Sequence, residues 1–248
     1  SLSVDADAIT HRGGSIRAND LRLRATGDIN HTGGLIAGDN SLALLAGGNI
    51  NAESQRIRTE GAQGYVENIS RVADIRLNGT GQTGELTLKA GGDISLTAAA
   101  VSNRAAGGST RLSAENIRLN SVTGSFAQNN QFDGNNWLKR SGSSEIGSVI
   151  RAQGDITLDA ARDIHARAAR LTSDRGDLAV YAGNDITLAS GRRTDSTDAA
   201  HKSSGKSGGG NSVSLTLRDR VDRDSAIASQ LSAENIILSA GRDITVAG

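Results

Sequence analysis

The sequence predicts an all-β protein, a parallel β-helix that occupies residues 1–248 as a single repeat segment. Three near-copies of one phrase support this prediction: LTLKAGGDISL at 86–96, LAVYAGNDITL at 178–188 and IILSAGRDITV at 236–246. In each copy, apolar and polar residues alternate on both sides of an Ala-Gly-x-Asp turn, which is typical of short strands with one buried face. Proline, which removes a ladder hydrogen bond, is absent, so the strands can pair without interruption.

An Asp or Asn followed by an aliphatic residue marks each repeat. The residues predicted to form a ladder at the turns are Asp28, Asn49, Asp74, Asp93, Asn116, Asp155, Asp163, Asp185, Asn235 and Asp243. Many successive members are about 21 residues apart, and a second such pair often follows after eight residues. We therefore expect at least two strands per coil and roughly nine coils, about 45 Å of rod at the usual strand spacing. The turn glycine is expected to bend the chain with a positive φ.

Two other architectures fit the sequence less well. No window carries apolar residues at helical spacing over three turns, which argues against helical hairpin repeats. The strands are also too close together along the chain for helical crossovers, which argues against a doubly wound sheet.

Two polar, glycine-rich stretches interrupt the repeat, at 120–147 and at 190–212. Both are predicted to be insertions that leave the rod as loops or hairpins. The first holds Phe126, Phe132 and Trp137, three of the five aromatic residues in the chain. We expect these aromatics to pin the insertion onto the side of the rod. The alternative is a contact patch for a partner.

Composition excludes several functions. With 27 basic and 27 acidic residues, the net charge is zero, which argues against nucleic acid or a membrane surface as partner. Cysteine is absent, so neither disulfides nor thiolate metal sites can form. The absence of Met favours an internal piece of a longer chain. Aromatic residues make up only 2%, so we expect a narrow core of Leu, Ile, Val and Ala.

Motifs for metal or nucleotide binding are weak. A row of turn carboxylates could hold Ca²⁺, but the nine-residue GGxGxDxUx pattern of the calcium-binding β-roll is missing. The stretch SGKSGGG at 204–210 resembles a phosphate loop, but Ala200 stands where that motif needs a glycine. We expect neither a metal nor a cofactor.

The four histidines are His11, His31, His165 and His201. A separation of 20 residues places the first two on adjacent coils, but no third ligand accompanies them. We therefore expect exposed turn positions for all four histidines.

Acid/base chemistry is the main enzymatic alternative, because some β-helices cleave polysaccharides with clustered carboxylates. The candidates would be Asp155, Asp163 and Asp185 with Arg162, all at repeat turns, which favours a structural role. The segment RDRVDRD at 218–224 is expected to be a solvated face or a strand edge.

The segment SLTLRDRVDRDSAIASQLSAENIILSAGRDITVAG at 214–248, together with GDLAVYAGNDITLASGR at 176–192, resembles the haemagglutinin repeats of filamentous haemagglutinin-type exoproteins. These exoproteins of two-partner secretion include adhesins and the toxins of contact-dependent growth inhibition. The resemblance implies a right-handed β-helical filament that leaves a Gram-negative cell unfolded, through an outer-membrane transporter. It also implies a secreted protein at the cell surface, whose further partner is the surface of a bacterial or host target cell.

From this resemblance we expect a non-catalytic shaft that supports presentation and delivery of a C-terminal toxin. The alternatives are an adhesin filament that binds host cells or glycans, and a β-helical polysaccharide lyase or hydrolase. The chain departs from the full family pattern because it shows neither a secretion domain, nor a toxin domain, nor the boundary tetrad Val-Glu-Asn-Asn. Unpaired strand edges are expected to favour self-association, end to end or along an edge.

Overall fold

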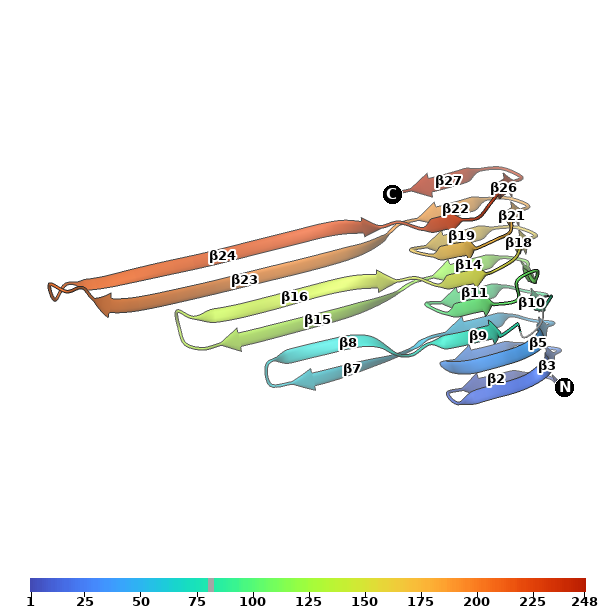
Figure 1. Cartoon of the computed structure of the whole chain (residues 1–248), viewed down its shortest axis with the longest axis horizontal. Coiled ribbons are helices and arrows are strands. Elements are labelled where there is room, and N and C mark those ends of the chain that lie inside the picture. Colours follow the sequence, from blue (N-terminus) through green and yellow to red (C-terminus); the bar gives the residue numbers. More distant parts are fainter. Residues whose placement is uncertain (80–82) are drawn as a thin grey trace.

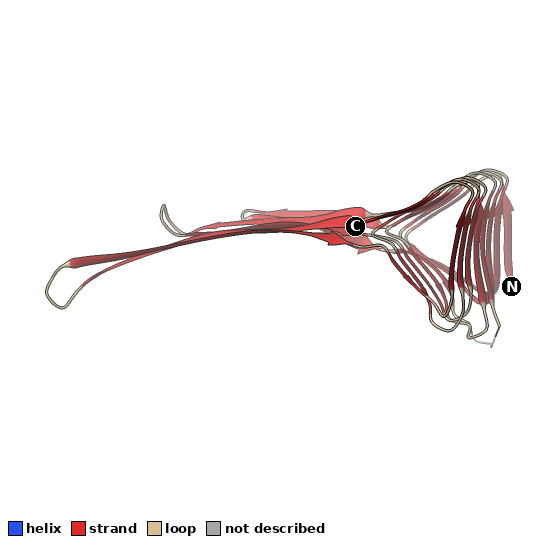
Figure 2. Ribbon diagram, turned by 90° about the horizontal axis from the view of Figure 1, so that it is seen from above, coloured by secondary structure: helices blue, strands red, loops and turns tan. Residues whose placement is uncertain are grey.

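Each copy of the repeated phrase folds into two strands joined by a corner, and the copies stack as the coils of a parallel β-helix (Figure 1). The computed structural model describes residues 1–79 and 83–248, and all of its regular elements are strands. Viewed along the rod, the coils form a triangle with a long sheet projecting from one corner (Figure 2). The predicted fold class is confirmed.

The three sides of the triangle are called faces 1, 2 and 3, in the order in which the chain visits them. Face 1 contains β1 (Leu2–Ala6), the second halves of β3 (Ser15–Ala25) and β5 (Gly34–Ala46), β10 (Glu85–Ala90), β13 (Ser109–Ala114), β18 (Ile156–Ala160), β21 (Leu178–Ala182) and β26 (Ile236–Ala240). Face 2 contains β2 (Ile9–Arg12), β4 (Ile29–Thr32), β6 (Ile50–Glu53), β11 (Ile94–Thr97), β14 (Ile117–Asn120), β19 (Ile164–Arg167), β22 (Ile186–Ala189) and β27 (Ile244–Ala247). Face 3 contains the first halves of β3 and β5, then β9 (Ala73–Leu77), β12 (Ala100–Asn103), β17 (Val149–Ala152), β20 (Arg170–Ser173) and β25 (Gln230–Ser232). Strands within a face are parallel, so residues at equal repeat positions stack in columns.

The core lies inside the triangle and consists of Leu, Ile, Val and Ala side chains. In β10, for example, Leu86 and Leu88 point inward and are fully buried, whereas Thr87 and Lys89 point outward. Small and medium aliphatics suit this narrow interior, because each coil is only one strand thick and adds about 4.8 Å of height. The expectation of an aliphatic core is confirmed.

Face 2 has eight strands, which gives eight coils instead of the expected nine, or about 35 Å of rod. One cause of the overcount is Asp74, which lies within β9 on face 3 and makes an ion pair with Arg76. The remaining turn residues before face 2 show two spacings: 21, 23 and 22 residues for short coils, and 44, 47 and 58 for long ones.

Each long coil contains a projecting hairpin. The three hairpins are β7 (Gln55–Gly61) with β8 (Gly64–Arg71), β15 (Val122–Gln131) with β16 (Trp137–Ile146), and β23 (Gly191–Lys206) with β24 (Ser212–Ile227). The second coincides with the predicted insertion at 120–147. The third extends beyond the predicted boundary at 212 to Ile227, because its return strand repeats the alternating pattern of a rod strand. The first hairpin, at 55–71, was not predicted.

Hairpins follow β6, β14 and β22, whereas β11 and β19 lead directly into β12 and β20. A hairpin is two strands wide, and two coils are two strands high, so hairpins on every second coil fill the available height without a gap. At the corners between hairpins the chain turns through Ala98 and Ala168, at φ values of 48° and 49°. These corners hold the hairpins at the spacing that lets them pair with one another.

The turn glycines do not have the positive φ that we expected. At Gly91 and Gly183 the glycine permits a close approach of successive coils: a Cβ on Gly91 would lie 2.3 Å from the carbonyl oxygen of Gly47, and one on Gly183 would lie 2.1 Å from that of Ala161. The glycine therefore removes a clash between coils, and backbone bending is not its role.

Gly91→Ala is accordingly expected to lower the free energy of unfolding by about 1–3 kcal/mol, because the coil must shift to admit the methyl group. Urea denaturation followed by circular dichroism measures this loss. Gly205→Ala is the matched control, since a Cβ at Gly205 meets nothing within 4 Å. Equal stability of the two variants would contradict the close-approach explanation.

Candidate functional site: the hairpin sheet

The three hairpins pair with one another into a six-stranded antiparallel sheet, in the order β24-β23-β16-β15-β8-β7, which we call the hairpin sheet. Phe126 on β15 lies opposite Val66 on β8 and opposite Gly142 on β16, and Gly142 lies opposite Asp195 on β23. The sheet extends away from one corner of the rod (Figure 1). Both of its faces are therefore accessible along most of their length.

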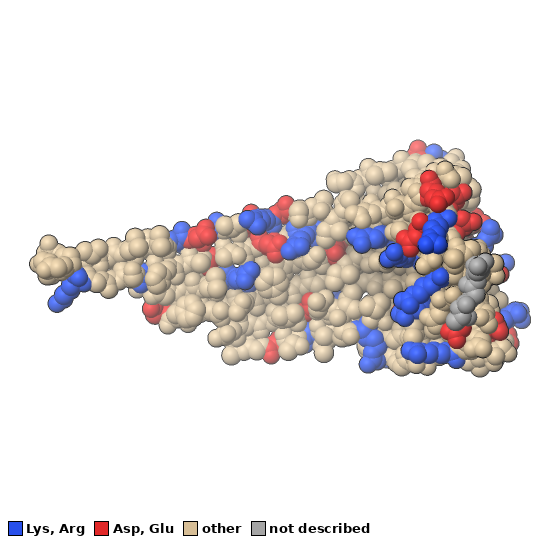
Figure 3. Space-filling view, in the orientation of Figure 1, with Lys and Arg blue, Asp and Glu red and all other residues tan. Residues whose placement is uncertain are grey.

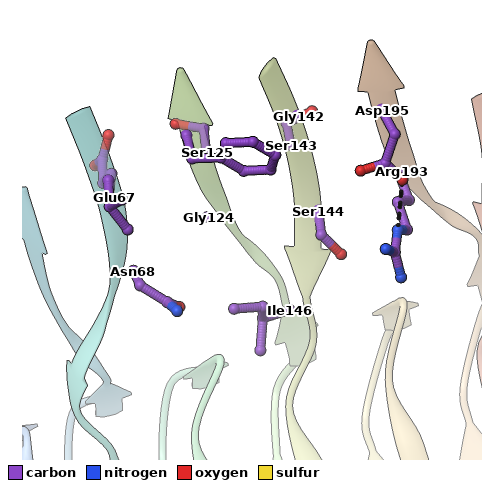
Figure 4. Close-up of a pocket in the computed structure, with 12 residues that line it drawn as sticks. Glu67, Asn68, Gly124, Ser125, Gly142, Ser143, Ser144, Ile146, Arg193 and Asp195 are labelled. Carbon is purple, nitrogen blue, oxygen red and sulfur yellow. Dashed lines mark hydrogen bonds and ion pairs between the residues drawn. The ribbon is translucent and has the colours of Figure 1, made fainter. Parts of the chain in front are cut away.

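A groove crosses one face of this sheet, between β8 and β23 (Figure 4). Its volume is about 250 Å³, and it is lined by residues of four strands from all three hairpins. Gly124 and Gly142 line the groove in the middle of two strands, where neither residue has a side chain to fill it. The Phe126 ring covers Gly142, since a Cβ there would lie 2.7 Å from its Cε1 atom.

The groove has a mixed lining. Apolar surface comes from Val66, Phe126 and Ile146, and one end carries the ion pair between Arg193 and Asp195, whose Nε and Oδ2 atoms are 3.0 Å apart. A second hollow shares Val66 and Phe126 and continues toward the hairpin tips. An aromatic ring beside hydroxyl, amide and charged groups is a surface that can bind polar ligands with apolar faces, such as glycans.

The three aromatic residues of the second hairpin do not form one cluster. Phe126 lines the groove, Trp137 lies on the opposite face of the sheet because side chains alternate, and Phe132 is 71% exposed at the hairpin tip. The expectation that they pin the insertion onto the rod is wrong, because this hairpin pairs with β8 and β23 and projects outward. Trp137 instead contacts Arg218, whose guanidinium carbon is 5.7 Å from the ring centroid.

Glu145 fixes the base of the hairpin sheet to the rod. Its carboxylate accepts two hydrogen bonds of 2.6 Å from Arg167 on β19, and one of 2.5 Å from the hydroxyl of Ser121. It also accepts a hydrogen bond from the backbone N–H of Arg192, where the third hairpin begins. The Arg167 guanidinium holds the pKa of Glu145 at about 2, with Ser121 adding to the effect. One side chain thus joins two hairpins and the coil between them.

Glu145→Ala is expected to lower the free energy of unfolding by about 2 kcal/mol, because charged hydrogen bonds are lost at a half-buried junction. Hydrogen exchange should show faster exchange at the bases of β16 and β23 than in the wild-type protein. Glu60→Ala is a suitable control, because its exposed ion pair with Arg58 lies on the outermost hairpin. Unchanged exchange at both bases would show that Glu145 does not hold the junction.

The predicted turn residues form two ladders, at different corners of the rod. Between faces 1 and 2, each Asp or Asn accepts a hydrogen bond from the following member: the backbone N–H of Asn49 donates to Asp28 at 2.7 Å, and that of Asp93 donates to Asn49 at 2.8 Å. This ladder contains Asp28, Asn49, Asp93, Asn116, Asp163, Asp185 and Asp243. Asp155 and Asn235 belong to the second ladder, before face 1, with Asp177 between them.

The acid/base candidates do not converge on one site. Asp163 and Asp185 each accept a backbone N–H in the first ladder, whereas Asp155 lies at the other corner. Arg162 pairs with Glu115 and not with these carboxylates. No group of three or more metal-ligating side chains occurs among the described residues. These positions hold coils together.

The histidines lie in strands, not at exposed turns as expected. His11 on β2 and His31 on β4 stack on adjacent coils with ring centroids 5.0 Å apart, and their Nδ1 atoms are 2.9 Å apart. His31 is buried at 1% exposure, in the column that Ala52 continues on the next coil. His165 is half-buried on β19, and His201 is exposed on β23. The SGKSGGG stretch forms the exposed tip of the third hairpin.

A chain whose successive coils stack on one another with the same parallel strand register is a solenoid protein. The family model of the hemagglutinin repeat matches residues 3–64 and 133–248, and the chain belongs to this family. It is a β-helical shaft segment of the filamentous exoprotein type, a group of generally non-enzymatic and typically secreted surface proteins. No curated protein and no solved structure matches the chain. In the described part of the chain, no helix is long and apolar enough to cross a bilayer.

Proposed function

We propose that this chain is a non-catalytic shaft segment that supports presentation and delivery of a C-terminal toxin in contact-dependent growth inhibition. The observation that supports the proposal best is the stacking of eight coils in one register, with equivalent side chains in continuous columns through the core. Such a stack is a rigid spacer built from a repeated sequence. In this proposal the exoprotein leaves a Gram-negative cell through an outer-membrane transporter of two-partner secretion. The absence of cysteine suits a chain that crosses that membrane unfolded.

The first test is genetic. Sequencing the gene past the codon for Gly248 should reveal a divergent C-terminal domain followed by a small immunity gene. Cells that carry this cassette should kill co-cultured cells that lack the immunity gene. Repeats that continue to a terminator without such a cassette would overturn the toxin role.

A second test asks whether the segment acts as a spacer. Deleting residues 93–162 joins Gly92 to Asp163 and removes two whole coils with the middle hairpin, so both the turn ladder and the alternation of hairpins are preserved. A spacer should keep most of its killing activity after this deletion. Deleting residues 93–140, which breaks the repeat, is the control and should abolish it. If the two-coil deletion is exported and folded but inactive, the segment is more than a spacer.

The groove favours a second candidate function, an adhesin that binds cells or glycans through the hairpin sheet. In this case the isolated segment should bind target cells saturably. Phe126→Ala should weaken that binding at least tenfold, because it removes the aromatic wall of the groove. Phe132→Ala is the matched control, since Phe132 is exposed at the tip and does not line the groove. Equal binding by both variants would exclude the groove as the contact site.

A further inference from the structure

The ring of Phe126 reaches across the floor of the groove. Phe126 on β15 lies directly opposite Gly142 on β16, and a Cβ on Gly142 would lie 2.7 Å from the Cε1 atom of the ring. An aromatic side chain that crosses to a glycine on the neighbouring strand covers the exposed backbone there. One side of the ring is therefore turned toward Gly142, and the other side is turned toward the groove.

A carboxylate oxygen reaches the same place from the next strand. Asp195 on β23 lies directly opposite Gly142, and the same Cβ would lie 3.1 Å from its Oδ1 atom. Its Oδ2 atom accepts a hydrogen bond of 3.0 Å from Nε of Arg193, whereas Oδ1 accepts none from the described residues. Figure 4 shows Arg193 and Asp195 together on β23, beside the strand that carries Gly142. An aromatic ring and an available hydrogen-bond acceptor therefore meet above one glycine.

This pair of groups suits a sugar ring. The face of an aromatic ring carries partial negative charge, which attracts the C–H groups on one face of a pyranose. The hydroxyl groups at the edge of the same sugar are donors for a carboxylate. A bound peptide strand would instead need a free sheet edge, and each of the four strands of the groove, β8, β15, β16 and β23, is paired on both sides.

The groove has no excess of positive charge, although both signs occur over the hairpin sheet (Figure 3). Arg193 is paired with Asp195, and Glu67, the remaining charged residue of the lining, pairs with Arg56 at 3.3 Å. Arg140 and Arg223 line a neighbouring hollow and not the groove itself. Because the acceptor above Gly142 is itself an anion, it repels the carboxylate or sulfate of an acidic sugar. The charge of the lining therefore favours an uncharged ligand.

The groove continues at both ends. Toward the tip of the first hairpin, the next hollow shares Val66 and Phe126 with it, and toward β24 another hollow shares Arg193 and Asp195. A sugar above Gly142 can therefore belong to a longer chain whose neighbouring units occupy these hollows. Six of the twelve lining residues come from 65–132, between the two parts that match the hemagglutinin repeat. The groove thus needs residues that the shared repeat does not supply.

We propose that the groove binds one hexopyranose unit of an uncharged polysaccharide, with Phe126 as the stacking platform and Asp195 as the acceptor for its hydroxyl groups. Arg193 is a positioning residue, because it holds the carboxylate through Oδ2 and leaves Oδ1 for the sugar. The proposal rests on the adhesin function given above as the second candidate and names the class of ligand for that same site. Such a polysaccharide can come from a bacterial or a host surface, and the experiments below separate these sources.

A purely structural role for the ring is the opposite interpretation, because a covered glycine stabilises a strand pair. That role involves only Phe126 and Gly142 and gives Asp195 no part. The ion pair of Asp195 is exposed, so its removal should change the free energy of unfolding very little. A loss of binding without a loss of stability on substitution of Asp195 therefore separates the two interpretations.

Titration calorimetry with defined hexasaccharides tests the class of ligand. The chain should bind at least one hexasaccharide of glucose, galactose or mannose, offered in α- and β-linked forms, and it should bind hexagalacturonate at least tenfold more weakly. The dissociation constant for the uncharged ligand should differ less than about twofold between low and high salt, because no ion pair forms. Equal or tighter binding of hexagalacturonate, or binding of none of the uncharged hexasaccharides, would overturn the proposal.

Two substitutions with matched controls test the residues. Asp195→Ala should weaken binding of the uncharged hexasaccharide about tenfold with unchanged stability. Asp222→Ala is its control: Asp222 also accepts a hydrogen bond from an arginine two residues earlier, from Nε of Arg220 at 3.1 Å, but lies on the opposite face of the sheet. Phe126→Ala should weaken binding at least tenfold, whereas Phe132→Ala should not change it. Equal affinities of the Asp195→Ala and Asp222→Ala variants would leave the ring with a structural role alone and would refute the proposal.

Competition on cells separates this proposal from the adhesin function on which it rests. If the chain binds cells and the uncharged hexasaccharide displaces it, both are supported, and the cells concerned, bacterial or host, identify the source of the ligand. Binding to cells that no uncharged hexasaccharide displaces would overturn the proposal and leave the adhesin function in place. Calorimetric binding without any binding to cells would support the sugar site and exclude the adhesin function.

Discussion

Replacing Leu88 with alanine is expected to lower the free energy of unfolding by about 2–5 kcal/mol. Leu88 lies on β10 in a middle coil, is fully buried, and stacks between Leu44 and Leu112 in one column of face 1. Truncation leaves a cavity that neighbouring coils cannot fill, because parallel strands with fixed register hold their side chains at set heights. Chemical denaturation monitored by circular dichroism measures this loss.

The consequence of this cavity should be local at first. Each coil of a solenoid contacts only its neighbours, so a weak coil divides the rod into two more independent halves. Hydrogen exchange should therefore rise first in β5, β10 and β13. Leu215→Ala provides the control, since Leu215 is 55% exposed on the hairpin sheet, and its effect should stay within about 0.5 kcal/mol. Similar losses for the two variants would contradict the core assignment.

The rod could be predicted from the sequence because its signals are local. Alternating aliphatics and Asp-Ile turns recur at nearly constant spacing, and each copy needs the same buried side and the same corner. Asp74 shows the limit of this reasoning. Its Asp-Ile-Arg-Leu context resembles that of a turn residue, yet it lies inside a strand of face 3. Only its partners on the adjacent coils, Leu35 and Ala100, distinguish it from a turn residue.

The hairpin sheet could not be predicted, for a different physical reason. Its strands pair between hairpins that are far apart in sequence, and that pairing depends on the height of two coils. In residues 55–71, polar and apolar residues alternate as in a strand, but the many charged side chains do not define a buried face. In addition, Asp74 resembles a turn residue, so its distance from Asn49 resembles the length of one coil. A signal was available in the alternation of short and long distances between true turn residues.

His31 could have been assigned correctly from its column. Aligning Ile29-Asn30-His31 with Ile94-Ser95-Leu96 places the imidazole at an inward position that leucine occupies elsewhere. Its polarity alone predicts an exposed turn, whereas its repeat position predicts a buried side chain. The same alignment explains why its titration affects the stability of the rod.

Lowering the pH from 7 to 4 is expected to reduce the free energy of unfolding by about 3 kcal/mol through His31. Burial, together with a smaller effect of the neighbouring His11, lowers the pKa of His31 to about 4. In the unfolded chain the pKa is about 6.5. Protons therefore bind the unfolded chain first, so stability begins to fall below pH 6.5 and continues to fall until about pH 4.

His31→Leu separates this effect from other acid-sensitive groups, because leucine fills the inward position without titrating. The variant should show a flatter stability profile between pH 6.5 and 4, whereas His201→Ala, at an exposed position, should keep the wild-type slope. Glu145 acts in a lower window, because its depressed pKa stabilises the fold above about pH 4.5 and loses that effect as the pH falls toward 2. If the free energy of unfolding falls equally in the wild-type protein and in the His31→Leu variant between pH 6.5 and 4.5, the buried imidazole is not the acid-sensitive group. If the two stability profiles differ only between pH 6.5 and 4.5, the acid sensitivity lies in the coils formed around β2 and β4.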